Sequence, residues 1–304
     1  MLLRSLVMQS GGRAGDRVGA QASDRGMADS GVMVIRRRPF RMWMVLGIAV
    51  MFTACSTVPT SFRPKEPLRP EEVSHRLLGQ VLASHVKDGV VDYPAVHKDD
   101  RFPAYLAQLD RVDPEALATR RERLAFWINA YNAFAVQGIL DHYSPASLVG
   151  RYRYFIGRDY RVGGTAINLY DLERQILIKQ FHEPLIHFAI VCASASCPKL
   201  QPWSYEPDQL TVQLDRAARE FINDPARNRF DRKNKVASLS MIFKWFEEDF
   251  TKAAGSVVSY ITRYVNDPEL VQDLMQSDYR IEYLKYDWSL NGLPPEEYTH
   301  AGQS

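Results

Sequence analysis

A run of apolar and aromatic residues over positions 121–140 constrains the fold more than any other feature of this sequence. The spacing predicts a helix whose large side chains cover more than one face, so it must be buried on most sides. Asn129 and Asn132 interrupt this apolar surface one turn apart. Because an unpaired buried amide costs about 1 to 3 kcal/mol, both need specific partners. Those partners are either loop backbone or a catalytic His or substrate that the amides orient.

Shorter elements are expected around this helix. The continuous apolar run over residues 185–191 predicts a central strand, and residues 152–162 with the following glycine pair predict a β-hairpin. Asn168 is placed to cap a helix, residues 208–223 form an amphipathic helix, and residues 280–286 alternate like a strand. No regular alternation of strands and helices is present. We therefore predict an α+β fold, a mostly helical single domain with a small β-sheet.

A basic and apolar segment precedes the domain. Residues 36–38 are arginines, an apolar run covers residues 42–52, and Cys55 follows small residues. This order resembles a bacterial lipoprotein signal, in which the cysteine becomes the lipid-carrying first residue. The apolar run is shorter than the roughly 20 residues that a membrane-spanning helix needs. The alternative interpretation is a short membrane anchor or a buried helix.

The export signal defines the predicted domain organisation. Residues 1–54 are expected to be an N-terminal extension and signal that is removed, and residues 55–70 a tether rich in proline. Residues 71–295 form a single globular domain, and residues 296–304 a disordered tail. Because Ser56, and not an aspartate, follows the cysteine, resemblance to known sorting signals favours the outer membrane, with the domain facing the periplasm.

The net charge argues against a nucleic-acid partner. Residues 1–54 contain eight Arg and three Asp, a net charge of +5, whereas the whole chain carries +2, which leaves −3 for the mature part. The basic character is thus a property of the signal and not of the domain. We expect the membrane as a partner through lipid at Cys55, together with an envelope protein or peptide.

Several distinctive motifs occur along the mature chain. They are residues 126–133 (FWINAYNA), residues 186–189 (IHFA) with Cys192, residues 196–198 (SCP), residues 242–246 (IFKWF), residues 248–250 (EDF) and residues 286–291 (YDWSLN). In this order they resemble the motifs of the domain of unknown function 547 family. The resemblance covers roughly residues 75 to 291 and implies one folded domain, without implying an established activity.

Cys192 and Cys197 allow three interpretations. Small residues separate them, so a turn can bring their Cα atoms within the 4.4 to 6.8 Å that a disulfide needs, and an exported protein meets an oxidising compartment. Alternatively one is a nucleophile that needs a nearby base such as His187. On a regular strand, however, His187 and Cys192 would point to opposite faces, about 16 Å apart. Metal ligation is the third interpretation, and it lacks a clear fourth ligand.

Three functional interpretations follow. The first is a lipid-anchored envelope module that binds a partner, with the cysteine pair as a structural staple and no cofactor or metal. The alternative is a cysteine-dependent hydrolase or acyltransferase acting on peptide or cell-wall material. Its candidate residues are Cys192, Cys197, His187, Asn132 and Glu173, the last being a surface carboxylate unless it faces the cysteines. A thiol–disulfide exchange role fits less well, because the cysteine spacing is not the redox CxxC.

Overall fold

Helix α5 (Arg120–Leu140) passes through the larger of two apolar cores in a computed structural model that describes residue 59 and residues 61–295. The helix begins with a capping box, in which the Thr119 side chain accepts from the Glu122 amide and the Glu122 side chain accepts from the Thr119 amide. Every residue from 124 to 136 is buried. The prediction of a helix buried on most sides is confirmed.

Short helices and strands surround α5. In chain order they are η1 (Pro70–Glu72), α2 (Arg76–His85), β1 (Val86–Lys87), β2 (Val90–Asp92), α3 (Tyr93–His97), α4 (Arg101–Arg111), α6 (Leu148–Phe155), β3 (Asp159–Val162), β4 (Thr165–Asn168), α7 (Leu169–Asp171), the π-helical segment η2 (Leu172–Ile178), α8 (Lys179–Phe181), α9 (Ile186–Ala189) and α10 (Leu210–Ile222). Asn168 caps α7 as predicted, because its side chain accepts from the Asp171 amide.

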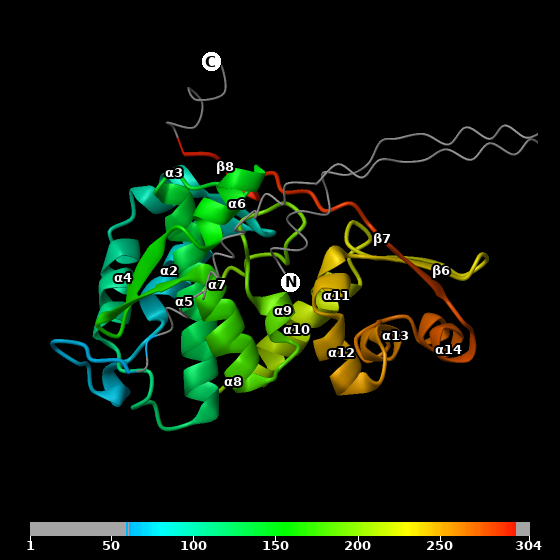
Figure 1. Ribbon diagram of the computed structural model, residues 1–304, viewed down its shortest axis with the longest axis horizontal. Coiled ribbons are helices and arrows are strands. Elements are labelled where there is room, and N and C mark those ends of the chain that lie inside the picture. The colour runs from blue at the N-terminus through cyan, green and yellow to red at the C-terminus, as the bar shows by residue number, and fades with distance from the viewer. Residues whose placement is uncertain (1–58, 60, 296–304) are drawn as a thin grey trace, which may run out of the picture. The chain divides into compact units, whose positions relative to one another are not determined.

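A second group of elements follows α10 and encloses the smaller core. It consists of β5 (Arg229–Asp231), β6 (Val236–Leu239), α11 (Met241–Trp245), α12 (Glu247–Ala254), α13 (Val257–Ile261), α14 (Pro268–Gln276) and β7 (Arg280–Tyr283), after which the chain returns to the first group as β8 (Gly292–Leu293). Figure 1 shows this second group in yellow to red beside α9 and α10. Leu185, Cys192 and Trp288 pack against both cores.

The strands form three small sheets, and the fold is α+β and mostly helical, as predicted. β1 pairs antiparallel with β2, which pairs in parallel with β8, so the C-terminal segment closes the sheet that begins before α3. β3 and β4 form the predicted hairpin. β6 lies between β5, antiparallel, and β7, parallel. The chain segment between β7 and β8 therefore joins the two groups of elements.

Two secondary-structure predictions were wrong in part. Residues 186–189 are the short helix α9 and not a central strand, and residues 152–155 belong to α6 and not to the hairpin. A short apolar run buried on all sides reads equally well as strand or helix, because no exposed face reveals its period. The Ile186 and His187 amides bond back to Glu183 and Pro184, which starts a helical turn directly after the proline.

Part of the predicted tether contacts the domain. The ring of Phe62 lies 5.4 Å from that of Trp127, and the Arg63 amide donates to Gly163 O. The predicted signal at residues 1–54, the lipidation site Cys55 and the tail at residues 296–304 lie outside the described residues. Within the described range, every helix is too short or too polar to traverse a bilayer.

Candidate functional site

The cysteine loop, residues 192–198, is closed by a disulfide between Cys192 and Cys197. Their Cα atoms lie 6.2 Å apart, within the range that a bridge requires, as the small-residue spacing predicted. Ala193 takes a left-handed backbone conformation with a φ of 58°. Cys197 is buried and Cys192 half-buried. Both sulfurs are therefore engaged in the disulfide, and neither is a free thiol in this structure.

The C-terminal strap, residues 286–291, pairs with the cysteine loop along its length. Ala195 N donates to Ser289 O at 2.7 Å, and Asn291 N donates to Ala193 O at 3.1 Å. Ser194 forms an antiparallel bridge with Leu290. The sequence patterns did not predict this pairing, although residues 286–291 form one of the motifs that resemble the family. The loop is consequently held by a covalent bridge and by a strand-like partner.

Tyr286 places a hydroxyl group against both sulfurs. Its Oη lies 3.2 Å from Cys197 Sγ and 3.3 Å from Cys192 Sγ, and it accepts from Ser194 Oγ at 3.0 Å. Burial above all, and the nearby Glu173 charge as well, raise the pKa of Tyr286 well above its usual value. The phenol therefore stays protonated near neutral pH. The groups around the disulfide are hydroxyls, none of which is a general base.

His187 lies apart from the disulfide contacts. Its Nε2 is 2.8 Å from Asp249 Oδ2, and its ring stacks on Phe246 with the centroids 3.8 Å apart. The hydrogen bond from His187 is the largest cause of a lowered pKa at Asp249. The second ring nitrogen, Nδ1, is buried without a partner. Both contacts place His187 on the side of α12, and none of its described hydrogen bonds or ring contacts reaches Cys192 or Cys197.

A small cavity of about 180 Å³ lies beside the His187–Asp249 pair. His182, Glu183 and Lys252 also line it. The second imidazole nitrogen, Nδ1, is buried and makes no hydrogen bond. A general base must reach the proton that it removes. In this structure the buried Nδ1 makes no such contact.

Asn132 and Asn129 both bind loop backbone. Asn132 Nδ2 donates to Ala189 O at 2.9 Å, and its Oδ1 accepts from the Val191 amide at 2.9 Å. Asn129 does the same for a single residue: Nδ2 donates to Tyr205 O at 2.7 Å, and Oδ1 accepts from Tyr205 N at 2.8 Å. Of the two alternatives, the structure shows the first. These amides position backbone, and neither contacts His187.

Glu173 is buried on η2 and not on the surface. Its Oε2 accepts from the Tyr131 hydroxyl at 3.2 Å, and its Oε1 lies 3.5 Å from Arg174 Nε. Burial first, then the Glu173 charge, raise the pKa of Tyr131 well above the usual value. The Glu173 charge also helps to raise the pKa of Tyr286, but the described partners of the carboxylate are Tyr131 and Arg174.

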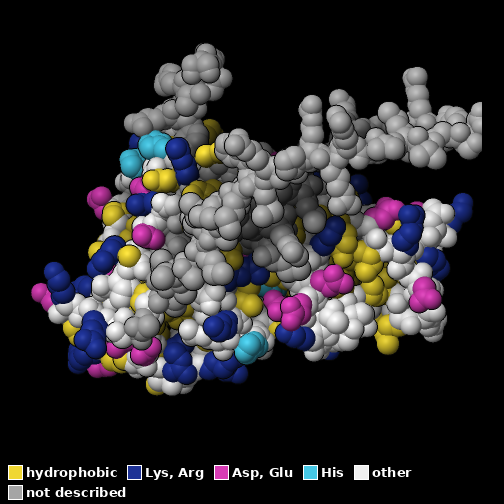
Figure 2. Space-filling view, in the orientation of Figure 1, with side chains coloured by type: hydrophobic (Ala, Val, Ile, Leu, Met, Phe, Trp, Pro, Cys, Tyr) yellow, Lys and Arg dark blue, Asp and Glu magenta, His cyan; other side chains and the backbone are white. Residues whose placement is uncertain are grey.

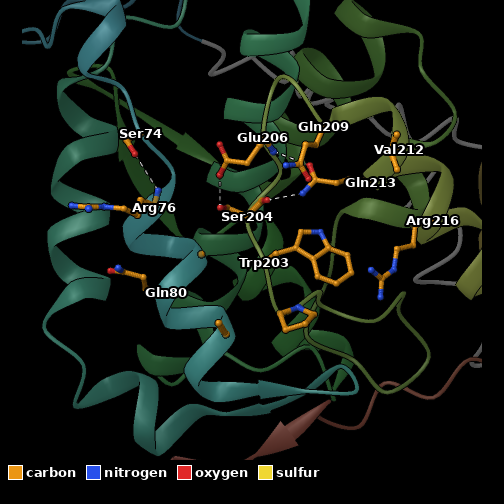
Figure 3. Close-up of a pocket in the computed structure, with 13 residues that line it drawn as sticks. Ser74, Arg76, Gln80, Trp203, Ser204, Glu206, Gln209, Val212, Gln213 and Arg216 are labelled. Carbon is orange, nitrogen blue, oxygen red and sulfur yellow. Dashed lines mark hydrogen bonds between the residues drawn. The ribbon is translucent and has the colours of Figure 1, made fainter.

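A larger cavity lies elsewhere, between α2 and α10 (Figure 3). It measures about 730 Å³ and is bounded by the groove loop, residues 202–206, which presents Trp203. Sequence reasoning did not find it, because its walls come from segments more than 100 residues apart. The adjacent Tyr205 is the residue that Asn129 holds. We refer to this cavity as the groove.

The residues of the described range include no group of three or more His, Cys, Asp and Glu side chains placed to hold a metal ion. Besides the two bridged cysteines, the candidate catalytic residues lie in three separate places. Asn132 lies under the cysteine loop, Glu173 lies against Tyr131, and His187 lies against α12.

Comparison with known proteins gives one match. No curated protein and no solved structure matches the sequence. A family model described as "Protein of unknown function, DUF547" matches residues 114–222. The matched range contains α5 with both clamping asparagines, the disulfide, the groove loop and all of α10. The chain is thus similar over residues 114–222 to a family of unknown function, and the match supports the resemblance inferred from its motifs.

Proposed function

We propose that this protein is an exported, lipid-anchored cell-envelope protein whose domain is a binding module. Lipid at Cys55 would hold it to the outer membrane, facing the periplasm, and the Cys192–Cys197 bridge would act as a structural staple. The order of arginines, apolar run, small residues and cysteine before residue 56 supports export and lipidation. A disulfide in the domain is consistent with an oxidising compartment.

The contacts of the two cysteine sulfurs are the main reason to favour a binding module over a cysteine-dependent enzyme. Cysteine catalysis needs a thiolate with a base within hydrogen-bond reach. Here both sulfurs are bridged, and the side chains that contact them are the hydroxyls of Ser194 and Tyr286. His187, the nearest candidate base in sequence, pairs with Asp249 instead. These contacts match a staple better than a nucleophile.

The surface charge supports a partner other than nucleic acid. Figure 2 shows Lys and Arg side chains interspersed with Asp and Glu on the visible face, without a broad basic area among the coloured residues. The net charge of −3 for residues 55–304 agrees with this distribution. A partner in the envelope, recognised by shape and hydrogen bonds, fits such a surface better than a polyanion does.

Anchoring is tested by the mass of the N-terminal peptide of protein extracted from membranes. We expect a diacylglyceryl group on Cys55, and we expect Cys55→Ser to release the domain from the membrane fraction. A soluble product cleaved at another position would overturn the anchoring part of the proposal.

The binding-module part is tested by thiol labelling of the native, non-reduced protein with iodoacetamide. The chain has three cysteines, so with Cys55 lipidated no thiol should react. Cys192→Ala should expose Cys197 to the reagent after partial unfolding, which shows that the assay detects it. Selective labelling of one thiol of the unmodified protein at neutral pH would indicate a depressed pKa. That result would favour the hydrolase or acyltransferase.

A further inference from the structure

The groove between α2 and the groove loop is built to a defined shape. Gly79 on α2 has no side chain to keep the loop away, and a Cβ added there would lie 2.8 Å from Ser204 Oγ. Ser204 Oγ in turn donates to Glu206 at 2.7 Å. The side-chain amide of Gln213 donates to Ser204 O and accepts from Glu206 N. The wall opposite α2 is therefore rigid before any ligand arrives.

Trp203 forms an aromatic plane in this wall. The guanidinium of Arg216 lies 4.4 Å from the centroid of its ring, and Arg216 Nε donates to Glu220 one turn further along α10 at 2.8 Å. These contacts hold the indole in one place on the groove. Its Nε1 makes no hydrogen bond in the structure. An aromatic ring fixed in this way at a cavity wall is a platform on which a ligand can pack.

Polar side chains without partners line the same cavity. Figure 3 shows Arg76 and Gln80 on α2, across the groove from Trp203 and Gln209, with their side chains extending away from the indole in this view. Among described residues, the side chains of Arg76, Gln80 and Gln209 form no hydrogen bond or ion pair, unlike Gln213. Amides donate and accept, and a guanidinium donates in several directions. The groove thus combines one aromatic plane with several free hydrogen-bonding groups.

We propose that the groove binds a segment of an uncharged glycan, with one sugar ring packed on Trp203 and hydroxyls of the segment bonded to polar side chains of both walls, Gln209 on one and Arg76 and Gln80 on the other. This inference rests on the proposed binding function and names its ligand class. A sugar ring offers an apolar C–H face and a rim of hydroxyls, which matches an indole flanked by amides. The volume of about 730 Å³ lies within the 300 to 1,000 Å³ that is usual for ligand sites.

The walls fit other polymers less well. A peptide that adds a strand needs an unpaired sheet edge, and the walls here are helix and loop. A helical peptide needs a continuous row of apolar anchors, whereas the apolar residues that line the groove, including Val212 at 72% exposure, are outnumbered by polar and charged ones. Glu206 and Glu220 balance part of the positive charge of Arg76 and Arg216. The groove therefore has no strong excess of one charge that would attract a highly charged polymer.

The test is calorimetric titration of the full-length protein, in detergent, with chitotetraose, cellotetraose and maltotetraose in turn. We expect saturable binding of at least one of these sugars. Trp203→Ala should weaken it about tenfold or more, as for a binding hot spot, and Gln80→Ala should weaken it less. Trp203→Phe retains a stacking plane and should retain part of the affinity. Met275→Ala, a change at an exposed apolar residue of α14 outside the groove, should leave it unchanged.

Equal thermal unfolding of the Trp203 variants and the unmodified protein would show that a loss of binding is local. Absence of binding by all three sugars, or binding insensitive to Trp203→Ala, overturns the glycan inference. A crosslinking experiment in intact envelopes separates this inference from the proposed function. If a protein partner is crosslinked and Trp203→Ala abolishes the crosslink, the binding function survives and the glycan is replaced by a protein ligand. Without sugar binding and without any crosslinked partner, both proposals fail.

Discussion

The cysteine loop and the groove loop are both anchored on α5 by the same kind of contact, yet they differ in everything else. Asn132 holds the backbone that leads into the cysteine loop, and Asn129 holds Tyr205 in the groove loop. The cysteine loop is then closed by a disulfide, by the C-terminal strap and by Tyr286. The groove loop is left open and carries Trp203 beside unpaired polar groups.

This difference shows that the loop with the chemically more reactive residues is not the loop that offers a surface for a ligand. Cysteines draw attention as candidate nucleophiles. In this protein, however, the hydrogen-bonding groups of the cysteine loop are already paired within the fold. The groove loop contains neither cysteine nor histidine. It nevertheless retains the features of a ligand site, namely a rigid wall, a cavity and free donors and acceptors.

Removal of either clamping amide should have the largest effect on stability. Asn132→Ala and Asn129→Ala each leave one buried C=O and one buried N–H unpaired, which costs roughly 2 to 6 kcal/mol in the free energy of unfolding. Chemical denaturation checks this. The two variants should differ in function, since only Asn129→Ala should weaken ligand binding at the groove. Equal loss of binding in both, at temperatures where both are folded, would contradict the division between the loops.

Acid should loosen the groove side first. Burial lowers the pKa of His75, the residue before α2, to about 4, against about 6.5 for an exposed histidine. The unfolded chain therefore binds the proton more readily between pH 6.5 and 4, and stability is lost as pH falls through that window. The full shift corresponds to at most about 3 kcal/mol.

The control for this prediction is His75→Gln, which removes the titrating ring but keeps a partner for Tyr105, whose hydroxyl lies 2.8 Å from His75 Nδ1. The difference in stability between pH 7 and pH 4.5 should be smaller in the variant than in the unmodified protein. Amide exchange at pH 4.5 should accelerate in α2 before it does in the cysteine loop. Acceleration in the loop first would reverse the assignment.

Loss of the disulfide should have a moderate effect on stability and none on the groove. The bridge closes a short loop, for which the chain-entropy estimate is about 2 kcal/mol. The double variant Cys192→Ala, Cys197→Ala should unfold at lower denaturant concentration and still bind at the groove. Abolished binding in a folded double variant would show that the two loops are coupled.

Two tryptophans provide the smallest and most direct contrast. Trp288, in the strap, has its ring 4.6 Å from that of Tyr286 and 5.8 Å from that of Trp245. Trp288→Ala should cost roughly 2 to 3 kcal/mol, somewhat less than a fully buried tryptophan. Trp203→Ala loses mainly its contact with Arg216, worth about 1 kcal/mol. Thermal unfolding of the pair measures the difference, and a larger cost at Trp203 would mean that its ring is structural.

Sequence patterns were sufficient wherever the determining contacts are local. The extent of α5 follows from its apolar spacing and the capping box at Thr119. The Asn168 cap and the small residues between Cys192 and Cys197 act over a few positions, and the structure has both the cap and the bridge. The need for partners at Asn129 and Asn132 also followed from the sequence, because a buried amide on an apolar helix has no other way to be satisfied.

Only the tertiary structure decided what those partners are. The Asn129–Tyr205 contact spans 76 residues, His187–Asp249 spans 62, and Ser194–Tyr286 spans 92. None of these pairings is visible in a local pattern, since each depends on how distant segments of the chain fold back onto one another. The same dependence explains why residues 186–189 are helical. Asn132 bonds Ala189 O and Val191 N, so this buried segment obtains backbone partners without a neighbouring strand.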